Sequence, residues 1–381
     1  MVSKCDFFII WLLSFSWTCG AQTEYEGQVI DAETGNPISY VNIGIVAKSI
    51  GTVSNGDGIF RLQIDARDLE GENSVLFSCL GYRTLEVPLA RLKSLDREYP
   101  KVKMEPEALE LNEVVVTNVD GRFIKDNVGY PYIGDEIFGY WKDNIALGGE
   151  LATRILVKKG PRILKRITFE IISNPSDSIL VRVNFYDDDG KLRLPGTNLN
   201  KSGKNILCTI PKGPRSLQVD LKDFNIQVDD NFIASLELLQ IYGRAELGLV
   251  VAGTRNISAS YRKYSSQDKW EEFSNKAMAY HLETSFKVHS KAADKYETRQ
   301  QRKLKRQRTV SGFVFKNGRM VPSVQISNLR TREQTTTDEK GRYIIRAKKG
   351  DILVFNKKGH KEEMKKVSDR PVLNAVIQAV E

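Results

Sequence analysis

The stretch "GTVSNGDGIFRLQI", residues 51–64, is the part of the chain that predicts the fold most directly. A short β-branched run leads into "SNGDG", and an alternating apolar and polar run, "IFRLQI", follows. The Asn55 side chain can accept hydrogen bonds from the backbone just after it, and Gly58 can adopt a positive φ without strain. The stretch therefore predicts two antiparallel β-strands joined by a tight turn.

A second copy of this hairpin lies near the other end of the chain, as "QTTTDEKGRYIIRA", residues 334–347. In both copies, the first matched threonine lies eleven positions after an upstream valine (Val41, Val324). Six positions match in order, with Thr52, Ser54, Asn55, Gly58, Phe60 and Leu62 falling on Thr335, Thr337, Asp338, Gly341, Tyr343 and Ile345. Matched spacing at both ends indicates a repeated small β-sandwich, since a unit of about 70–80 residues can hold its own core.

The first copy, "GQVIDAETGNPISYVNIGI…GTVSNGDGIFRLQI…LGYRTLEVPL", resembles the carboxypeptidase regulatory-like domain, a transthyretin-like seven-stranded sandwich. The resemblance covers about residues 24–105, and a weaker one covers 309–381. "LELNEVVVT", residues 109–117, is similar to the strand that often closes this domain in secreted and outer-membrane proteins of Gram-negative bacteria. In those proteins it commonly precedes the plug of a TonB-dependent receptor, but only 264 residues follow Thr117, so we do not expect a complete receptor here.

The remaining sequence completes an all-β organisation. Short strand-like runs between turns fill residues 118–286, with no long helical period. We expect two small transthyretin-like seven-stranded sandwiches, at 22–117 and 309–381, flanking a larger central β-sandwich for which a jelly roll is one possible topology. Residues 287–308 hold 9 Lys/Arg against 2 Asp/Glu and no apolar stripe, which favours a basic linker, either a solvated helix or a disordered tether.

The N-terminus predicts export. Lys4 precedes the apolar run "FFIIWLLSFSW", which is shorter than the ~20 residues of a membrane span, and small residues follow it. We interpret residues 1–21 as a signal peptide cut after Ala21, with lipidation of Cys19 as the alternative, and expect a periplasmic or outer-membrane-associated protein. Two cysteines, Cys79 and Cys208, then remain, and buried free thiols are favoured over a disulfide.

Charge is spread unevenly along the chain, whose net charge is +9. Residues 22–117 carry 9 Lys/Arg against 16 Asp/Glu, giving −7, whereas residues 309–381 carry 15 against 8, giving +7. For an exported protein we expect no nucleic-acid partner. Anionic lipid or lipopolysaccharide head groups, or the acidic N-terminal domain itself, would suit the basic segment 287–308 better, and a plain linker is favoured over both.

The sequence predicts no catalytic site, cofactor or metal. His360 and Glu363 form a His-x-x-Glu pair like that of zinc carboxypeptidases, but no histidine lies among the 18 residues after Glu363. Nucleophile and phosphate-loop motifs are also missing. Asp187–Asp189 before Gly190 could offer oxygen ligands to calcium, yet no further spaced ligands follow, so a solvated hairpin turn is favoured.

These observations favour a non-catalytic binding or scaffold protein of the cell envelope, acting through sheet edges and loops. The alternative is a carbohydrate-binding accessory protein acting through the central sandwich. For that alternative the candidate glycan contacts are Tyr261, Tyr264 and Trp270, because aromatic rings can stack on sugar rings, although such rings more often border a sandwich core. Exposed aromatic residues on one face of the central sandwich would favour the glycan hypothesis, and exposed edge strands would favour a protein partner.

Overall fold

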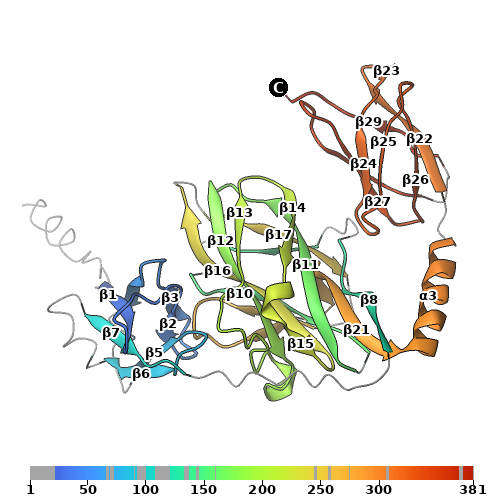
Figure 1. The fold of residues 1–381 in the computed structure, drawn as a ribbon. Helices are drawn as coiled ribbons and strands as arrows, with labels where there is room; N and C mark the ends of the chain where they lie inside the picture. The colour runs from blue at the N-terminus through green and yellow to red at the C-terminus, as the bar shows by residue number, and fades with distance from the viewer. Residues whose placement is uncertain are drawn as a thin grey trace, which may run out of the picture. The chain divides into compact units, whose positions relative to one another are not determined.

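A computed structural model of the protein describes residues 22–65, 68, 73–89, 91, 100–107, 121–132, 137–142, 146–158, 160–243, 247–255, 259–273, 275–305, 309–368 and 372–380. The predicted signal peptide and the predicted closing strand at 109–117 lie outside these residues. The chain divides into two compact units, Met1–Pro106 with Ser265–Lys269, and Glu107–Tyr264 with Trp270–Glu381. Strands dominate both units, which confirms the all-β fold class (Figure 1).

The first unit contains a seven-stranded sandwich, as predicted. One sheet has the order β4-β1-β7 and the other β3-β2-β5-β6. The strands are β1 (Gln22–Asp31), β2 (Asn42–Ile45), β3 (Ile50–Val53), β4 (Ile59–Asp65), β5 (Ser74–Ser78), β6 (Leu85–Pro88) and β7 (Lys101–Met104). Along β4, Phe60, Leu62 and Ile64 are buried between more exposed neighbours, so the alternation read from the sequence directs one face into the core.

The turn before β4 forms as its residues predict. The Asn55 side-chain oxygen accepts hydrogen bonds from the backbone N–H of Asp57 (3.0 Å) and Ile59 (2.9 Å). Gly58 has φ +73°, and a Cβ there would lie 2.6 Å from the carbonyl oxygen of Val29. Both the conformation and the close approach therefore require glycine at position 58.

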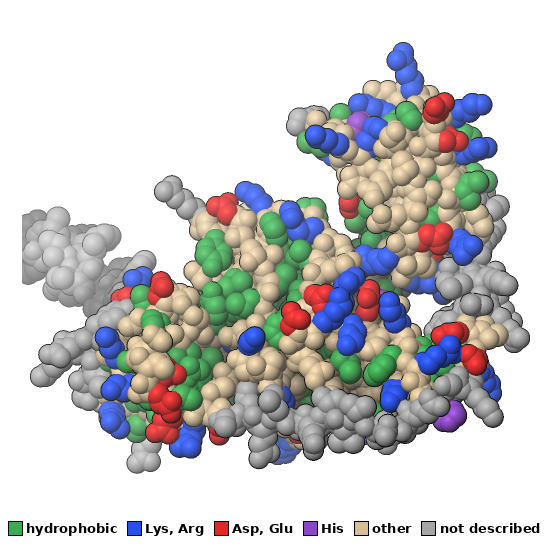
Figure 2. Space-filling model, viewed as in Figure 1, with side chains coloured by type: hydrophobic (Ala, Val, Ile, Leu, Met, Phe, Trp, Pro, Cys, Tyr) green, Lys and Arg blue, Asp and Glu red, His purple; other side chains and the backbone are tan. Residues whose placement is uncertain are grey.

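The C-terminal module, residues 309–368 and 372–380, repeats this topology with one additional two-residue strand, β23, so it has eight strands where seven were expected. One sheet is β23-β22-β26 with β29 beside β22, and the other is β25-β24-β27-β28. The strands are β22 (Thr309–Lys316), β23 (Arg319–Met320), β24 (Gln325–Asn328), β25 (Gln334–Thr336), β26 (Arg342–Arg346), β27 (Ile352–Asn356), β28 (Glu363–Lys366) and β29 (Ala375–Val376). β29 runs parallel to β22 as β7 does to β1, and lysine and arginine side chains cover much of one end of the module (Figure 2).

Matching hydrogen bonds show that the two copies are similar in structure as well as in sequence. Asp338 accepts from the backbone N–H of Lys340 (3.0 Å) and Arg342 (2.8 Å), as Asn55 does in the first copy. The Ser54 hydroxyl accepts from Val41 N–H at 2.8 Å, and the Thr337 hydroxyl accepts from Val324 N–H at 2.9 Å. Each repeated polar residue thus satisfies the backbone of its own hairpin.

The central module is a two-sheet sandwich with more strands than the eight of a jelly roll. The first sheet has the order β13-β12-β16-β10-β18-β19. Its strands are β13 (Leu207–Pro211), β12 (Ser178–Asp187), β16 (Phe232–Tyr242), β10 (Glu150–Ile155), β18 (Ser260–Lys263) and β19 (Glu271–Phe273). The second sheet has the order β20-β17-β11-β21-β8, with β14 and β15 on β11 and β9 on β17. Its strands are β20 (Lys276–Met278), β17 (Val250–Arg255), β11 (Arg162–Ser173), β21 (His281–His289), β8 (Gly121–Gly129), β14 (Arg215–Asp220), β15 (Gln227–Val228) and β9 (Ile137–Tyr140).

The core of this module lies between the two sheets and includes Trp141, Phe169, Phe185, Phe232 and Tyr280. After β21 the chain forms helix α3 (Ser290–Lys305), in the segment for which a helix or a tether was expected. α3 is not wholly solvated, because Ala293 is buried and the ring of Tyr296 meets that of Phe286 edge-on, with centroids 5.6 Å apart. Tyr296 also donates to Asp126 at 2.7 Å and Asp294 pairs with Arg122, so contacts with β8 and β21 hold a helix that has no apolar stripe.

Candidate functional site

Strand β9 places two aromatic rings on the surface of the central module. Phe138 and Tyr140 are 40% and 39% exposed, whereas Gly139 and Trp141, on the opposite side of the strand, are buried. Trp141 is held by its backbone N–H, which donates to Leu249 O at 2.9 Å, and by its indole N–H, which donates to Gly149 O at 3.2 Å. The alternation in "IFGYW" therefore anchors one face of β9 and presents the other to solvent.

β9 is also an edge strand. It pairs antiparallel with β17, with Phe138 opposite Ala252 and Tyr140 opposite Val250, and this is its one strand pairing among the described residues. Gly139 allows the close packing, since a Cβ there would lie 2.3 Å from the Met278 sulfur. An edge strand leaves backbone N–H and C=O groups able to pair with another extended segment.

Cations lie over the Tyr140 ring. The Lys142 Nζ is 4.9 Å from the ring centroid and the Arg262 guanidinium carbon is 5.2 Å from it. The same guanidinium lies 5.6 Å from the ring of Tyr264, and its buried Nε has no hydrogen-bond partner among the described residues. We call Phe138, Tyr140, Lys142, Arg262 and Tyr264 the β9 site; such rings and cations can bind aromatic, planar or acidic groups.

The three aromatic residues predicted to contact glycan occupy different environments. Tyr261 is buried, and its hydroxyl donates to Arg193 O at 2.9 Å. Tyr264 is partly buried and belongs to the β9 site, while the partly exposed Trp270 meets the edge of Tyr186 and has Lys263 Nζ 4.9 Å from its ring centroid. The structure thus does not gather the three rings into one stacking surface; the glycan role of these residues stays a prediction.

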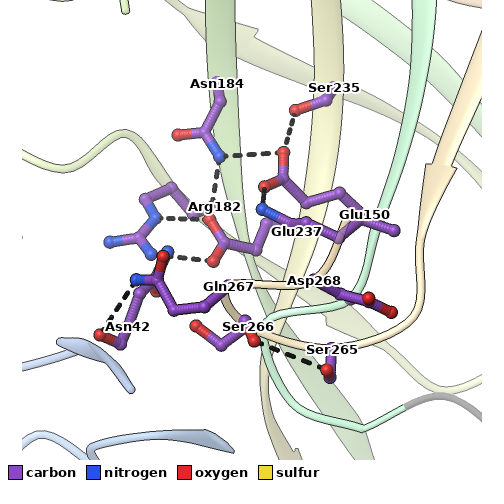
Figure 3. A network of polar contacts seen from close by, with 12 residues as sticks. Asn42, Glu150, Arg182, Asn184, Ser235, Glu237, Ser265, Ser266, Gln267 and Asp268 are labelled. Atoms are coloured by element: carbon purple, nitrogen blue, oxygen red, sulfur yellow. Dashed lines mark hydrogen bonds and ion pairs between the residues drawn. The ribbon is translucent and has the colours of Figure 1, made fainter. Parts of the chain in front are cut away.

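A row of four charged residues crosses four adjacent strands of the first central sheet. Figure 3 labels Arg182, Glu237 and Glu150 of this row. In cross-strand register Arg182 lies opposite Glu237, Glu237 opposite Glu150, and Glu150 opposite Lys263. Arg182 forms two hydrogen bonds to the Glu237 carboxylate (2.8 and 2.9 Å), and Lys263 Nζ lies 2.5 Å from Glu150 Oε1. We call these four residues the charged row.

Polar neighbours complete the charged row. Ser235 donates to Glu150 at 2.6 Å, and the Asn184 amide donates to Glu237 at 2.8 Å. Burial alone would raise the pKa of Glu237, but the Arg182 guanidinium, with help from Lys263 and Asn184, lowers it below the ordinary value. The two carboxylates could be mistaken for an acid and base pair, but each is balanced by a cation and hydrogen-bonded, which suits a structural role.

Other residues with chemical potential are accounted for by local structure. Asp188 pairs with Arg154, and Asp189 accepts two hydrogen bonds from Thr197 (2.8 and 2.7 Å), which fits the predicted hairpin turn. Within the described ranges, no three His, Cys, Asp or Glu side chains converge as metal ligands would. Cys79 and Cys208 are free, as favoured, but both are half-buried rather than buried as expected; desolvation of its thiol raises the pKa of Cys208 to about 11.

Neither the β9 site nor the charged row has a direct signal in the sequence. The four residues "IFGY" are too few to establish an alternation of apolar and polar positions. Which face of the strand is exposed can be assigned only once Gly139 and Trp141 are known to be buried. The four members of the charged row come from β10, β12, β16 and β18, which only the sheet order brings together.

Comparisons with known proteins bear on the first module. Residues 25–116 match the family model of the CarboxypepD_reg-like domain, which confirms the resemblance of the first copy. The chain is 31% identical over 125 residues to TonB-dependent receptor P39 of Formosa agariphila, covering 32% of this chain and 11% of that protein. The chain therefore spans about a ninth of the length of this relative.

Solved structures show only distant likeness. The major pilin subunit BcpA of Bacillus cereus is 10% identical with a TM-score of 0.16, covering 94% of this chain and 99% of that chain. The cysteine protease and lectin-like domains of Cwp84 of Clostridium difficile are 10% identical with a TM-score of 0.26, covering 65% and 58%. Scores this low carry no argument about function. No helix in the described part of the chain combines the length and the apolar character that crossing a membrane requires.

Proposed function

We propose that this chain is an exported, non-catalytic binding protein of the cell envelope, and that its β9 site holds an extended segment of a protein partner. The observation that carries the proposal is an edge strand with two exposed aromatic residues on one face and cations beside them. An added strand would gain main-chain hydrogen bonds from β9, and its alternate side chains would meet Phe138 and Tyr140.

The first module supports the proposed place of the protein in the envelope. The match of residues 25–116 and the partial likeness to a TonB-dependent receptor support export to the periplasm or the outer membrane. We extend the same family to the second copy, because its hairpin repeats the contacts of Asn55 and Ser54 through Asp338 and Thr337. The saturated hydrogen bonding of the charged row supports a role without catalysis.

The test is site-specific photo-crosslinking in the host. A photoreactive phenylalanine analogue replaces Phe138, and a second strain carries the analogue at Tyr242, which is 39% exposed and lies at the end of β16. We expect one discrete envelope-protein adduct at position 138 and none at 242, and loss of that adduct when Tyr140→Ser is added. Equal crosslinking at both positions, or an adduct that survives Tyr140→Ser unchanged, would contradict the proposal.

Glycan binding is the second candidate, because the β9 site has the exposed rings that stacking on a sugar needs. Affinity electrophoresis in gels containing alginate or a neutral β-glucan tests it. Retardation that Tyr140→Ser abolishes and Trp270→Ser does not would favour glycan binding at β9. Retardation lost with Trp270→Ser would point back to the residues predicted from the sequence.

A further inference from the structure

A second site lies at one end of the central module, away from the strands of the β9 site. A cleft of about 830 Å³ is lined by β8, by the end of β21, by residues 156–158 and 160–161 between β10 and β11, by the first residue of β11, and by α3. Its volume is in the range of small-molecule pockets, about 300–1,000 Å³. We call it the α3 cleft.

The walls of the α3 cleft have two characters. One part is apolar and is formed by Val128, Leu156, Val157, Phe286 and Val288. The other part is basic and is formed by Lys158, Arg162, Lys287 and Arg299. Asp126 is the one carboxylate among the described lining residues, so the lining side chains carry a net charge of +3 from four cations and one carboxylate.

Arg162 and Asp126 form the neutral floor of the cleft. Arg162 is 5% exposed, donates to Asp126 Oδ2 at 3.1 Å and to Lys158 O at 3.3 Å, and lies 5.0 Å from the Phe286 ring centroid. Tyr296 donates to the other Asp126 oxygen at 2.7 Å. Asp126 and Arg162 thereby balance each other in charge, while the buried Nε of Arg162 has no hydrogen-bond partner in the described part of the chain, so this end of the cleft is short of one hydrogen-bond acceptor.

The rim adds unbalanced positive charge beside exposed apolar surface. Lys158 and Arg299 are exposed, and no ion pair joins either to a described residue. Leu156, two residues before Lys158, is 45% exposed. Contact with water is favourable for the cations but unfavourable for the leucine side chain. A ligand with a negative charge and an apolar portion would pair with the cations and remove the leucine from water at the same time.

We propose that the α3 cleft binds an anionic amphiphile, a single acyl chain that carries a phosphate or carboxylate group. The acyl chain packs along Leu156, Val157 and Val288, and the anionic group lies between Lys158 and Arg299. Inorganic phosphate would use only the basic wall, and a neutral lipid only the apolar wall; the side-by-side arrangement selects a molecule that has both.

The test uses the chain from Gln22 to Glu381 and calorimetric titration with lysophosphatidic acid below its critical micelle concentration. Lysophosphatidylcholine and inorganic phosphate are the comparison ligands. The charge-reversed variant Lys158→Glu with Arg299→Glu is paired with Lys276→Glu with Lys295→Glu, which makes the same change in net charge at exposed lysines outside the cleft. Leu156→Asn tests the apolar wall, and thermal unfolding confirms that each variant folds.

We expect lysophosphatidic acid to bind more tightly than either comparison ligand. Reversing Lys158 and Arg299 should raise its dissociation constant at least about tenfold, since charge-assisted contacts become repulsive, and the control pair should leave it within about twofold. Leu156→Asn should weaken lysophosphatidic acid and leave phosphate unchanged. Two results of the titrations would overturn the proposal: equal affinity for the two lysolipids, or an equal effect of the control pair of substitutions. Binding to phosphatidylglycerol vesicles without binding to single amphiphile molecules would overturn it as well.

Discussion

Replacing Arg182 by alanine tests the charged row. Glu237 is fully buried, and Arg182 supplies two of its hydrogen bonds, at 2.8 and 2.9 Å. Arg182→Ala would leave a buried carboxylate whose remaining side-chain donor among the described residues is the Asn184 amide. Removing one partner of a buried ion pair typically costs about 3–5 kcal/mol, and we expect the lower end of that range because Lys263 still lies nearby.

The effect should depend on pH, with a sign that follows from the two pKa values. In the native row the pKa of Glu237 lies below its ordinary value, so the carboxylate stabilises the fold above the unfolded-state pKa, and that stability is lost as the pH falls through the folded value. Without Arg182, burial raises the pKa of Glu237 instead, so protonation relieves the buried charge. The difference in stability between native and variant proteins should therefore shrink as the pH falls from 7 through the raised pKa of Glu237 in the variant, and then through its lowered pKa in the native protein.

Tryptophan fluorescence during urea unfolding measures this effect selectively. After the predicted signal peptide the chain has two tryptophans, Trp141 and Trp270, and both lie in the central module. For a module of this size a slope of about 2–3 kcal/mol per molar urea converts the loss into a midpoint shift of about 1–2 M. The matched control is Arg166→Ala, because Arg166 pairs at 3.6 Å with the half-exposed Glu283 and such surface pairs contribute less than about 1 kcal/mol. A loss for Arg182→Ala no larger than the control, or one that grows as the pH falls, would show that the charged row does not stabilise the module in this way.

Three further predictions concern the first unit and the cysteines. Gly51→Ala should raise amide hydrogen exchange in residues 265–269, because a Cβ at position 51 would lie 2.3 Å from Ser266 O. Gly56→Ala is the control and should leave this exchange unchanged, since a Cβ at position 56 would have no neighbour nearer than 3.5 Å. Equal exchange in both variants would count against the packing of Gly51 on Ser266. Asn55→Ala should destabilise the first sandwich by about 1–2 kcal/mol, because two hydrogen bonds to its side-chain oxygen are lost. Asn55→Asp keeps an acceptor oxygen and should retain most of that stability, as measured by hydrogen exchange of the β4 amides. An equal loss of stability in both variants would contradict the role given to the side-chain oxygen. Cys208, with its pKa raised to about 11, should react with iodoacetamide at about pH 8 far more slowly in the native protein than in urea. Equal rates by mass spectrometry would contradict the desolvation of this half-buried thiol.

Experiments on the two proposed binding sites can be separated because the sites are formed by different segments of the central module. The β9 site depends on Phe138 and Tyr140, and the α3 cleft depends on Lys158, Arg299 and Leu156. Tyr140→Ser should leave lysophosphatidic acid binding unchanged, and Lys158→Glu with Arg299→Glu should leave the crosslink at position 138 unchanged. Failure of one proposal would thus leave the other standing.

The hairpins of the two small sandwiches are encoded by local sequence alone. Asn55 and Gly58, like Asp338 and Gly341, act on backbone atoms within a few residues, so the pattern of letters contains the whole interaction. The same is true of the alternation in β4, which selects the buried face without reference to any other segment. The all-β fold class could therefore be predicted from local patterns.

The places where charged and aromatic residues gather depend instead on tertiary structure. The charged row joins residues as far apart as Glu150 and Lys263 through the order β12-β16-β10-β18, and the α3 cleft joins β8 to a helix more than 150 residues later. Packing likewise buried Tyr261 and exposed Phe138, although the sequence presents both as aromatic residues in short strands. Side-chain exposure depends on which strands become neighbours, and strand order is set by the burial of the whole apolar surface rather than by any local pattern.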